Sequence, residues 1–319
     1  MKPVNGLHHI TAMATDAQRN LDFYAGVLGM RLVKRSVNQD DPGTYHFFYA
    51  DAEGRPGTDL TFFPWANLAA PRKGTGLTTE VQLAVPEGSL AFWEERLRRY
   101  GVRLGSPETR FGEPALPFQD PDGLEVALVE TGPRPFTPWE QSEVPENRQI
   151  MGLHGARLWE RTLYPTAEFL RQALGFEPAG QENGWSRFTV AGGGSGKFVD
   201  IKEYPNLPQG RWGRGSVHHI AWRVDDSDHQ LQVRGQITAT GMGATPQIDR
   251  FWFKSVYFNE PGGALFELAT DGPGFAVDED PAHLGERLVL PPWLEPQRSQ
   301  IEALLPEIQL PTPAAQVRE

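Results

Sequence analysis

Residues 6–30 read "GLHHITAMATDAQRNLDFYAGVLGM", and residues 152–176 read "GLHGARLWERTLYPTAEFLRQALGF". A constant shift of 146 positions places the first segment on the second. The identities at this shift are Gly6 with Gly152, Leu7 with Leu153, His8 with His154, Phe23 with Phe169, Leu28 with Leu174 and Gly29 with Gly175. Because the register holds through an apolar stretch and the helix-like segment after it, the chain contains an internal repeat.

A second pair of segments matches at a shift of 140 positions, and its last matches lie in the phrases "FQDPDG" and "FNEPGG". The identities are Gly101 with Gly241, Arg110 with Arg250, Phe111 with Phe251, Phe118 with Phe258, Pro121 with Pro261 and Gly123 with Gly263. The two repeats together predict four modules. They span about residues 6–66, 78–131, 151–205 and 216–271.

The modules predict two halves, residues 1–131 with modules 1 and 2 and residues 150–271 with modules 3 and 4. Between them, residues 132–149, "GPRPFTPWEQSEVPENRQ", have the proline-rich polar composition of a linker. The remainder, residues 272–319, is a C-terminal tail in which "SQIEALLPEI" predicts a short helix packed on the outside.

Each module reads as a strand, a helix and three further strands. In module 1, "HHITAMA" predicts the first strand and "DAQRNLDFYAGVL" the helix, with Asp16 as N-cap and Gly29 as the left-handed residue that ends it. "RLVKRSV", "TYHFFYA" and "TDLTFFP" then predict three strands. A βαβββ unit leaves one face of a curved sheet open, so two units are needed to close it. We therefore expect an α+β fold of four βαβββ modules that form two incomplete β-barrel cups.

Composition restricts the partners of the chain. The absence of cysteine excludes a disulfide framework, a thiolate metal site and a cysteine nucleophile. A net charge of -11 argues against nucleic acid and anionic membrane surfaces, and no apolar run is long enough for a membrane span. The start, "MKPVNGLHHI", lacks the apolar core of a signal peptide, so a cytoplasmic location and a small-molecule partner are expected. A homo-oligomer stays open.

Half of the eight histidines lie in two similar strands, "LHHIT" and "VHHIA". Side chains alternate along a strand, so only one histidine of each pair faces the interior of a cup. His9 and His219 share a face with small or apolar neighbours, and Glu267 interrupts the apolar strand "GGALFELAT". A buried carboxylate needs a partner or a metal. Two imidazoles and one carboxylate form the facial set typical of non-haem Fe(II).

Core histidines and an arginine-paired Glu267 are the competing interpretation. The repeat favours ligands, because His9 and His219 both lie on first strands of modules and Glu267 lies on a last strand. Gly155 replaces His9 in module 3, Ala127 replaces Glu267 in module 2, and His219 falls near Thr79 or Glu80 depending on a one-residue gap. Modules 1 and 4 therefore carry all three candidate ligands, and the corresponding positions in modules 2 and 3 lack them.

This ligand set also predicts how the modules pair. Three atoms within roughly 2.0–2.2 Å of one metal must come from the walls of one cavity. His9 belongs to module 1, whereas His219 and Glu267 belong to module 4. Module 1 should therefore close its cup with module 4, and module 2 with module 3.

At these residues the chain resembles the vicinal oxygen chelate superfamily, which includes glyoxalases and extradiol dioxygenases, and most closely its hydroquinone ring-cleaving dioxygenases, which include the chlorohydroquinone 1,2-dioxygenases. The phrases that carry the resemblance run from residue 7 to about residue 287: "LHHIT", "VKRSV", "YHFFYAD", "GRPGT", "TFFP", "TRFGE", "VHHIAWRV", "FNEPGG" and "GFAVDEDPAHLGE". The resemblance implies His9, His219 and Glu267 as Fe(II) ligands, with Mn(II) or Zn(II) as substitutes in a purified sample. It also implies an outer set of catalytic residues, namely His8, Thr11, His218, Arg250 and Tyr257.

The residues themselves qualify this outer set. Thr11 lies on the inward face with His9, whereas a regular pleat turns His8 and His218 away from the metal unless the strand ends or bulges there. Arg250 matches Arg110 in the other cup, so part of its role is architectural. Tyr257, whose counterpart is Pro117, is expected to hydrogen-bond a substrate oxygen or pass on a proton.

The expected activity is that of an Fe(II)-dependent, extradiol-type dioxygenase that opens a hydroquinone or catechol ring and incorporates both atoms of O₂. A glyoxalase-type lyase or isomerase using Zn²⁺ or Ni²⁺ is an alternative that needs a fourth protein ligand, for which Asp59 is the acidic residue available. A metal-free protein that binds a small aromatic molecule is a further alternative.

Overall fold

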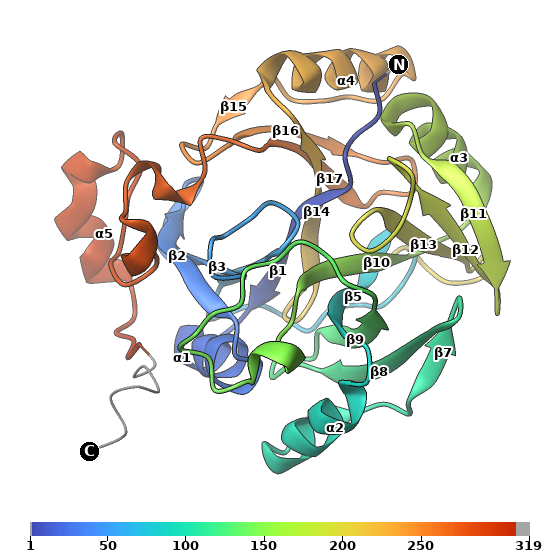
Figure 1. Ribbon diagram of the computed structural model, residues 1–319. Coiled ribbons are helices and arrows are strands. Elements are labelled where there is room, and N and C mark those ends of the chain that lie inside the picture. Colours follow the sequence, from blue (N-terminus) through green and yellow to red (C-terminus); the bar gives the residue numbers. More distant parts are fainter. Residues whose placement is uncertain (1, 311–319) are drawn as a thin grey trace.

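The computed structural model describes residues 2–310, and two curved sheets lie side by side in it (Figure 1). In spatial order, the first sheet consists of β15 (Ile248–Asp249), β16 (Lys254–Asn259), β17 (Leu265–Thr270), β14 (Val217–Val224), β1 (Leu7–Ala14), β4 (Asp59–Pro64), β3 (Asp41–Ala50) and β2 (Arg31–Asn38). Every strand of this sheet comes from module 1 or module 4.

The second sheet combines modules 2 and 3. Its order is β11 (Glu177–Glu182), β12 (Trp185–Thr189), β13 (Phe198–Glu203), β10 (Gly152–Glu160), β5 (Leu77–Pro86), β9 (Glu125–Thr131), β8 (Glu113–Gln119) and β6 (Arg103–Leu104), with β7 (Glu108–Arg110) paired to β8. The predicted α+β fold class and the predicted pairing of modules are confirmed. We call the first sheet the metal cup, after the site it was predicted to carry, and the second sheet the second cup.

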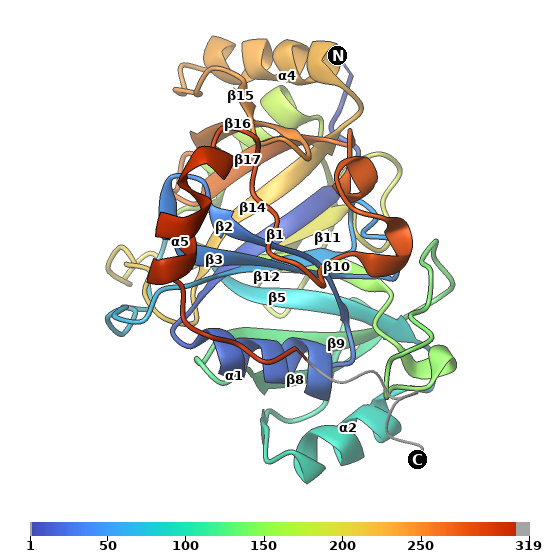
Figure 2. The same cartoon turned by 90° about the vertical axis from the view of Figure 1, so that its left-hand side faces the viewer.

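Helices cover the outer faces of both sheets (Figures 1 and 2). They are α1 (Ala17–Leu21), α2 (Leu90–Arg99), α3 (Leu163–Phe169) and α4 (Ser227–Ala239). Asp16 caps α1 by accepting the amide of Arg19 at 2.8 Å, as predicted. The expected continuous α-helix is instead widened, because its second half, Asp22–Val27, is π-helical, and α3 continues in the same way into Leu170–Leu174.

The first strands of the four modules meet at the centre of the molecule, where β1 lies beside β14 and β10 beside β5 (Figure 1). Ile10, Leu83, Leu153 and Ile220 are fully buried there in one continuous hydrophobic core. These four strands fix the position of both cup interiors, because each contributes its inward-facing residues to one cup.

The β1–β14 pair contains two bulges. Leu7 lies opposite Trp222 and His9 opposite Ala221, so β1 has one extra residue, His8. Thr11 lies opposite His219 and Ala12 opposite Val217, so the extra residue on β14 is His218. The bulge that the sequence left open is therefore present at both histidine pairs, and it turns neighbouring side chains toward the same side of the sheet.

The second cup repeats both bulges. In the β10–β5 pair, His154 is the extra residue on one strand and Thr79 on the other. Arg157 lies opposite Glu80, as Thr11 lies opposite His219. The one-residue ambiguity of the sequence comparison is thus resolved, and Glu80 holds the position of His219.

The tail forms three short 3₁₀ turns, Phe275–Val277, Pro281–His283 and Glu295–Gln297, and then α5 (Arg298–Leu304). Buried Ile301 packs α5 against Val37 of β2, which confirms the short outer helix, and residues 311–319 of the predicted tail lie outside the described part. The 132–149 segment contains one 3₁₀ turn, Glu146–Arg148. The division of the chain at this linker stays a prediction. Within residues 2–310, no helix is long and apolar enough to cross a membrane.

Candidate metal centre

Three side chains converge inside the metal cup from three neighbouring strands. His9 comes from β1, His219 from β14 and Glu267 from β17, and their ligand atoms all lie within 4.8 Å of one another. His219 Nε2 is 3.2 Å from His9 Nε2 and 2.9 Å from Glu267 Oε2, and His9 Nε2 is 3.4 Å from the same oxygen. The structure therefore brings together the three residues that the sequence analysis selected.

The chemistry of these atoms fits a divalent cation. Burial alone would raise the pKa of Glu267, but the two histidines beside it hold that pKa well below its usual range. Ser255 donates to Glu267 Oε1 at 2.5 Å, whereas the buried Oε2 has no hydrogen-bond partner. Burial lowers the pKa of His219, which leaves the neutral imidazole that a metal requires. An unpaired carboxylate oxygen facing two imidazole nitrogens suits Fe(II) or a similar ion.

The outer histidines hold the ligand histidines in place. The Nδ1 atoms of His8 and His9 are 2.9 Å apart, and those of His218 and His219 are 2.8 Å apart. His8 Nε2 lies 3.1 Å from the carbonyl oxygen of Thr270, which can only accept a hydrogen bond. His8 must then donate from Nε2 and accept at Nδ1, so His9 donates from Nδ1 and keeps a lone pair on Nε2 for the metal. Burial lowers the pKa of both His8 and His218 to about 3.

Thr11 lies beside the same centre. Its Oγ1 is 3.0 Å from His219 Nε2 and 2.7 Å from Thr61 Oγ1, and Thr61 Oγ1 is 3.0 Å from His46 Nε2. His46, which lies on β3 and faces the cavity, was not among the site residues predicted from the sequence. In "TYHFFYA" this histidine shares an alternation pattern with Phe48 and carries no separate signal of function. Burial lowers the pKa of His46 well below its usual range, so the ring is neutral.

Arg250 and Tyr257 also face the cavity. Arg250 forms a bidentate ion pair with Asp40, at 3.1 and 2.7 Å, and its guanidinium carbon is 5.4 Å from the centre of the Tyr257 ring. The Tyr257 ring centre is 5.8 Å from that of His219. Burial, together with the charge of Glu267, raises the pKa of Tyr257, so its hydroxyl stays protonated and can donate a hydrogen bond.

A cavity of about 470 Å³ opens from the centre toward solvent. The lining residues are His9, Asn38, Gln39, Asp40, Asp41, His46, Phe48, Phe63, Trp65, Trp212, His218, His219, Arg250, Trp252, Phe253, Tyr257 and Leu265. Aromatic side chains dominate this lining, as expected of a pocket for an apolar ring. His8, Thr11 and Glu267 are not among the lining residues.

Asp59 does not join the metal ligands. It lies next to His9 in the parallel β1–β4 pair, but it is outside the set whose atoms converge within 4.8 Å. Burial raises the pKa of Asp59 well above its usual range, and its Oδ1 has no hydrogen-bond partner. The fourth ligand that a glyoxalase-type site would need is not supplied by this residue.

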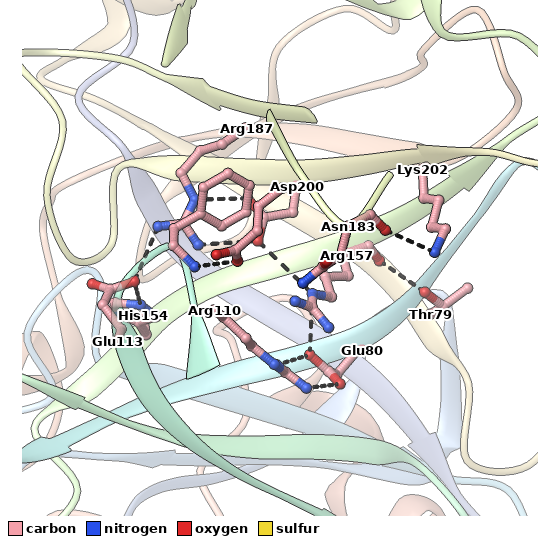
Figure 3. A network of polar contacts seen from close by, with 12 residues as sticks. Thr79, Glu80, Arg110, Glu113, His154, Arg157, Asn183, Arg187, Asp200 and Lys202 are labelled. Carbon is pink, nitrogen blue, oxygen red and sulfur yellow. Dashed lines mark hydrogen bonds and ion pairs between the residues drawn. The ribbon is translucent and has the colours of Figure 1, made fainter. Parts of the chain in front are cut away.

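The second cup is filled differently at the same positions. A Cβ on Gly155, the counterpart of His9, would come within 2.3 Å of the Phe198 ring, so that ring takes up the space of the missing histidine. The interior of the second cup contains a chain of alternating basic and acidic side chains (Figure 3). Its members are Arg110, Glu80, Arg157, Asp200, Arg187, Glu113 and His154. The second cup therefore has a self-contained ion-pair network where the metal cup has its three converging ligand atoms.

Comparison with known sequences gives two kinds of match. The sequence profile of the "Glyoxalase/Bleomycin resistance protein/Dioxygenase superfamily" matches residues 6–128 and 154–268. A Bacillus subtilis (strain 168) protein named "Putative ring-cleaving dioxygenase MhqO" is 45% identical over 306 residues, which cover 96% of this chain and 97% of that protein. The "Chlorohydroquinone/hydroquinone 1,2-dioxygenase" of Sphingobium indicum is 33% identical over 311 residues, 93% of this chain and 95% of that protein.

A solved structure agrees over the whole fold. The crystal structure of a "putative dioxygenase" from Bacillus subtilis subsp. subtilis str. 168 superposes with a TM-score of 0.93 at 43% identity. The match covers 98% of this chain and 99% of the other. The arrangement of two cups is therefore shared with that protein.

Proposed function

Because the chain belongs to the glyoxalase/bleomycin resistance protein/dioxygenase superfamily, we propose that it is a ring-cleaving dioxygenase that opens a hydroquinone or catechol with O₂. The proposed metal is Fe(II), held by His9, His219 and Glu267. The observation that carries the proposal is the convergence of these three ligand atoms at the inner end of a cavity of about 470 Å³ lined by aromatic side chains.

The relatives support the class of reaction. The relative at 45% identity is named a putative ring-cleaving dioxygenase, and the one at 33% identity is named a chlorohydroquinone/hydroquinone 1,2-dioxygenase. The 2-His-1-carboxylate set is the one that non-haem Fe(II) oxygenases use, and it leaves metal positions open for substrate and O₂. Bound Fe(II) would supply a Lewis-acidic, redox-active centre for the two reactants.

The residues around the centre then have separate tasks. Protonated Tyr257 can donate a hydrogen bond to an oxygen of the diol, and the positive charge of Arg250 behind it favours an anionic oxygen there. Neutral His218, at the cavity wall, accepts at Nδ1 when His219 donates from Nδ1, so its proton lies on Nε2 and can be donated in a hydrogen bond to a substrate oxygen. Phe48 and Phe253 close the cavity around the ring, which reduces the water near the reacting atoms.

The test is O₂ uptake by protein loaded with Fe(II) under anaerobic conditions. We expect consumption of O₂ in proportion to added hydroquinone or catechol, and an open-chain carboxylic product detected by mass spectrometry. His219→Ala should lose both bound iron, measured by elemental analysis, and O₂ uptake. Iron-loaded protein that consumes no O₂ with any member of a hydroquinone and catechol panel would contradict the proposal.

The same experiment separates the alternatives. A glyoxalase-type lyase would convert its substrate without O₂, on Zn²⁺ or Ni²⁺. A metal-free binding protein would bind its aromatic ligand equally well after His219→Ala. The position of Asp59 outside the converging set argues against the first of these.

A further inference from the structure

We propose that the preferred substrate of this site is a diol that carries a second flat apolar group, either a fused or an attached ring, rather than a bare one-ring diol. The inference rests on the proposed ring-cleaving function and names its substrate class. Phe63, Trp65 and Trp212 form the outer wall of the cavity, and we call these three residues the aromatic wall.

The aromatic wall lies against His218, the residue that precedes the ligand His219. The ring centre of His218 is 5.6 Å from that of Phe63, 6.2 Å from that of Trp65 and 6.1 Å from that of Trp212. A group on the far edge of a diol bound at the ligand end would extend past His218 toward these rings. Stacked or edge-on contact with such rings is favourable for a flat apolar group.

The segments that carry the two tryptophans are joined through their backbones. Trp65 follows β4 directly, and its Nε1 donates to Asp41 at 2.7 Å. The loop that carries Trp212 is joined to the segment after Trp65 by reciprocal amide–carbonyl bonds between Arg72 and Arg211, at 2.8 and 2.9 Å. A Cβ at Gly213 would lie 2.3 Å from the carbonyl oxygen of Ala69, so glycine is required for this close approach. The backbone therefore positions both tryptophans of the aromatic wall before a substrate binds.

The size of the cavity points to the same substrate class. At about 470 Å³ it falls in the range of roughly 300–1,000 Å³ that holds drug-sized ligands, so a one-ring diol would leave most of it to water. Trp212 is 50% exposed although its loop is fixed, which presents an apolar surface that a substrate ring would cover.

Acidic side chains lie at the mouth of the cavity beside the aromatic wall. Asp40 is paired with Arg250, and Asp41 accepts a hydrogen bond from Trp65 Nε1 at 2.7 Å. A carboxylate or sulfonate on the far edge of the diol would lie near these two carboxylates, whereas an uncharged ring meets the aromatic wall.

The experiment compares hydroquinone with 1,4-dihydroxynaphthalene and phenylhydroquinone on anaerobically iron-loaded protein. We expect kcat/KM from O₂ uptake to be at least tenfold higher for the two-ring diols. Trp212→Ala and Trp65→Ala should each lower kcat/KM tenfold or more for the two-ring diols and less than threefold for hydroquinone. Tyr164→Ala, which removes an aromatic ring that is 74% exposed outside the cavity, is the matched control and should change neither.

Binding without O₂ provides a second measurement. Anaerobic quenching of tryptophan fluorescence should give a dissociation constant at least tenfold lower for 1,4-dihydroxynaphthalene than for hydroquinone, and Trp212→Ala should remove the difference. Equal kinetics and equal binding for one-ring and two-ring diols would overturn the inference while leaving ring cleavage intact. Absence of O₂ uptake with every diol would instead overturn the proposed function. In that case the anaerobic dissociation constants alone would test the inference, and tighter binding of the two-ring diol would support it.

Discussion

The metal cup and the second cup are built from the same type of module and have the same two bulges, but their interiors carry different side chains. Where the metal cup has Thr11 opposite His219, the second cup has Arg157 opposite Glu80. Both cups place polar side chains in a closed interior, which is costly without partners. The metal cup arranges them around a site that fits a cation, and the second cup pairs them with one another.

The comparison shows that the same backbone arrangement accommodates different side chains at its interior positions. Glu267 in the metal cup corresponds to Ala127, and Tyr257 to Pro117, so the second cup lacks a ligand and a hydrogen-bond donor at the same positions. Arg250 and Arg110 show the reverse, because the same residue type has different partners. Arg250 binds Asp40 at the cavity mouth, whereas Arg110 binds Glu80 in the interior, at 2.5 and 2.9 Å.

The largest expected effect is loss of iron and activity on changing a proposed ligand in the metal cup, since only this cup is proposed to bind a metal. Glu267→Gln keeps the shape of the side chain but removes the charge that balances a cation, so bound iron should be lost. O₂ uptake should fall by about 10³-fold or more, the scale of losing a main source of transition-state stabilisation. Iron content by elemental analysis and O₂ uptake are the two measurements. If Glu80→Gln in the second cup caused the same loss of iron, the separation of the two cups would be wrong.

The second effect is on stability and belongs to the second cup. Glu80→Ala removes the more buried of the two carboxylates that Arg110 and Arg157 share, and breaking such a buried pair costs up to about 3–5 kcal/mol. Urea unfolding measures the loss, and iron content should not change. Glu108→Ala is the matched control. It removes a half-exposed partner of the same Arg110 and should cost about 1 kcal/mol or less.

A third effect tests whether Phe198 occupies the space of the missing histidine. Gly155→Ala adds a methyl group in collision with that ring and should lower the free energy of unfolding by about 1–3 kcal/mol. Thermal unfolding of Gly155→Ala, with and without Phe198→Leu, checks this. The double variant should recover part of the loss, because the smaller side chain gives the new methyl group room. A fully stable Gly155→Ala protein would show that the second cup has space for a ligand after all.

The smallest expected effect concerns the buried carboxyl groups of Glu160 and Glu260, whose repeat counterparts do not form a carboxyl pair. Glu160 of β10 corresponds to Ala14 of β1, and burial together with Glu260 raises the pKa of Glu160 from 4.5 to about 9. The folded protein then keeps a proton that the unfolded chain releases above pH 4.5. The free energy of unfolding therefore falls as the pH rises from 4.5 toward 9, by at most about 1.4 kcal/mol for each pH unit.

Glu160→Gln removes this titration, since the amide is neutral at every pH. Unfolding free energies of the wild type should decline relative to the variant by about 1 kcal/mol or more between pH 5 and pH 8. Asp120, the counterpart of Glu260, contacts the Tyr24 hydroxyl instead of a second carboxyl group, and Asp120→Asn is the comparison variant. Parallel pH profiles for wild type and Glu160→Gln would mean that the pair does not share a proton.

The repeated phrases were enough to predict the fold and the pairing of modules. Two shifts, 146 and 140, gave four modules, and the need for one cavity to hold His9, His219 and Glu267 gave the pairing of module 1 with module 4. The convergence of these three side chains was also predictable, because strand alternation places each of them on an inward face.

Other features depend on contacts that the sequence does not display. The sequence left open whether the two strands are regular or bulged, and a regular strand would turn His8 and His218 away from the metal. His46 reaches the centre through two threonines, Thr11 and Thr61, which come from different strands. The ion-pair network of the second cup joins residues from several strands of two modules, and no spacing rule connects them. Metal identity and the roles of the outer residues stay predictions.

The strand order also sets a sequence of events during protein synthesis. The second cup draws its strands from residues 77–203, whereas β1 has no partner on its β14 side until residues 217–224 have left the ribosome. The ion-paired cup can therefore close first, while the first strand waits with one edge open for a partner about two hundred residues downstream. Such distant pairing is slow, and an open strand edge favours aggregation. The second cup is then the part of the nascent chain that can complete its fold before the metal cup.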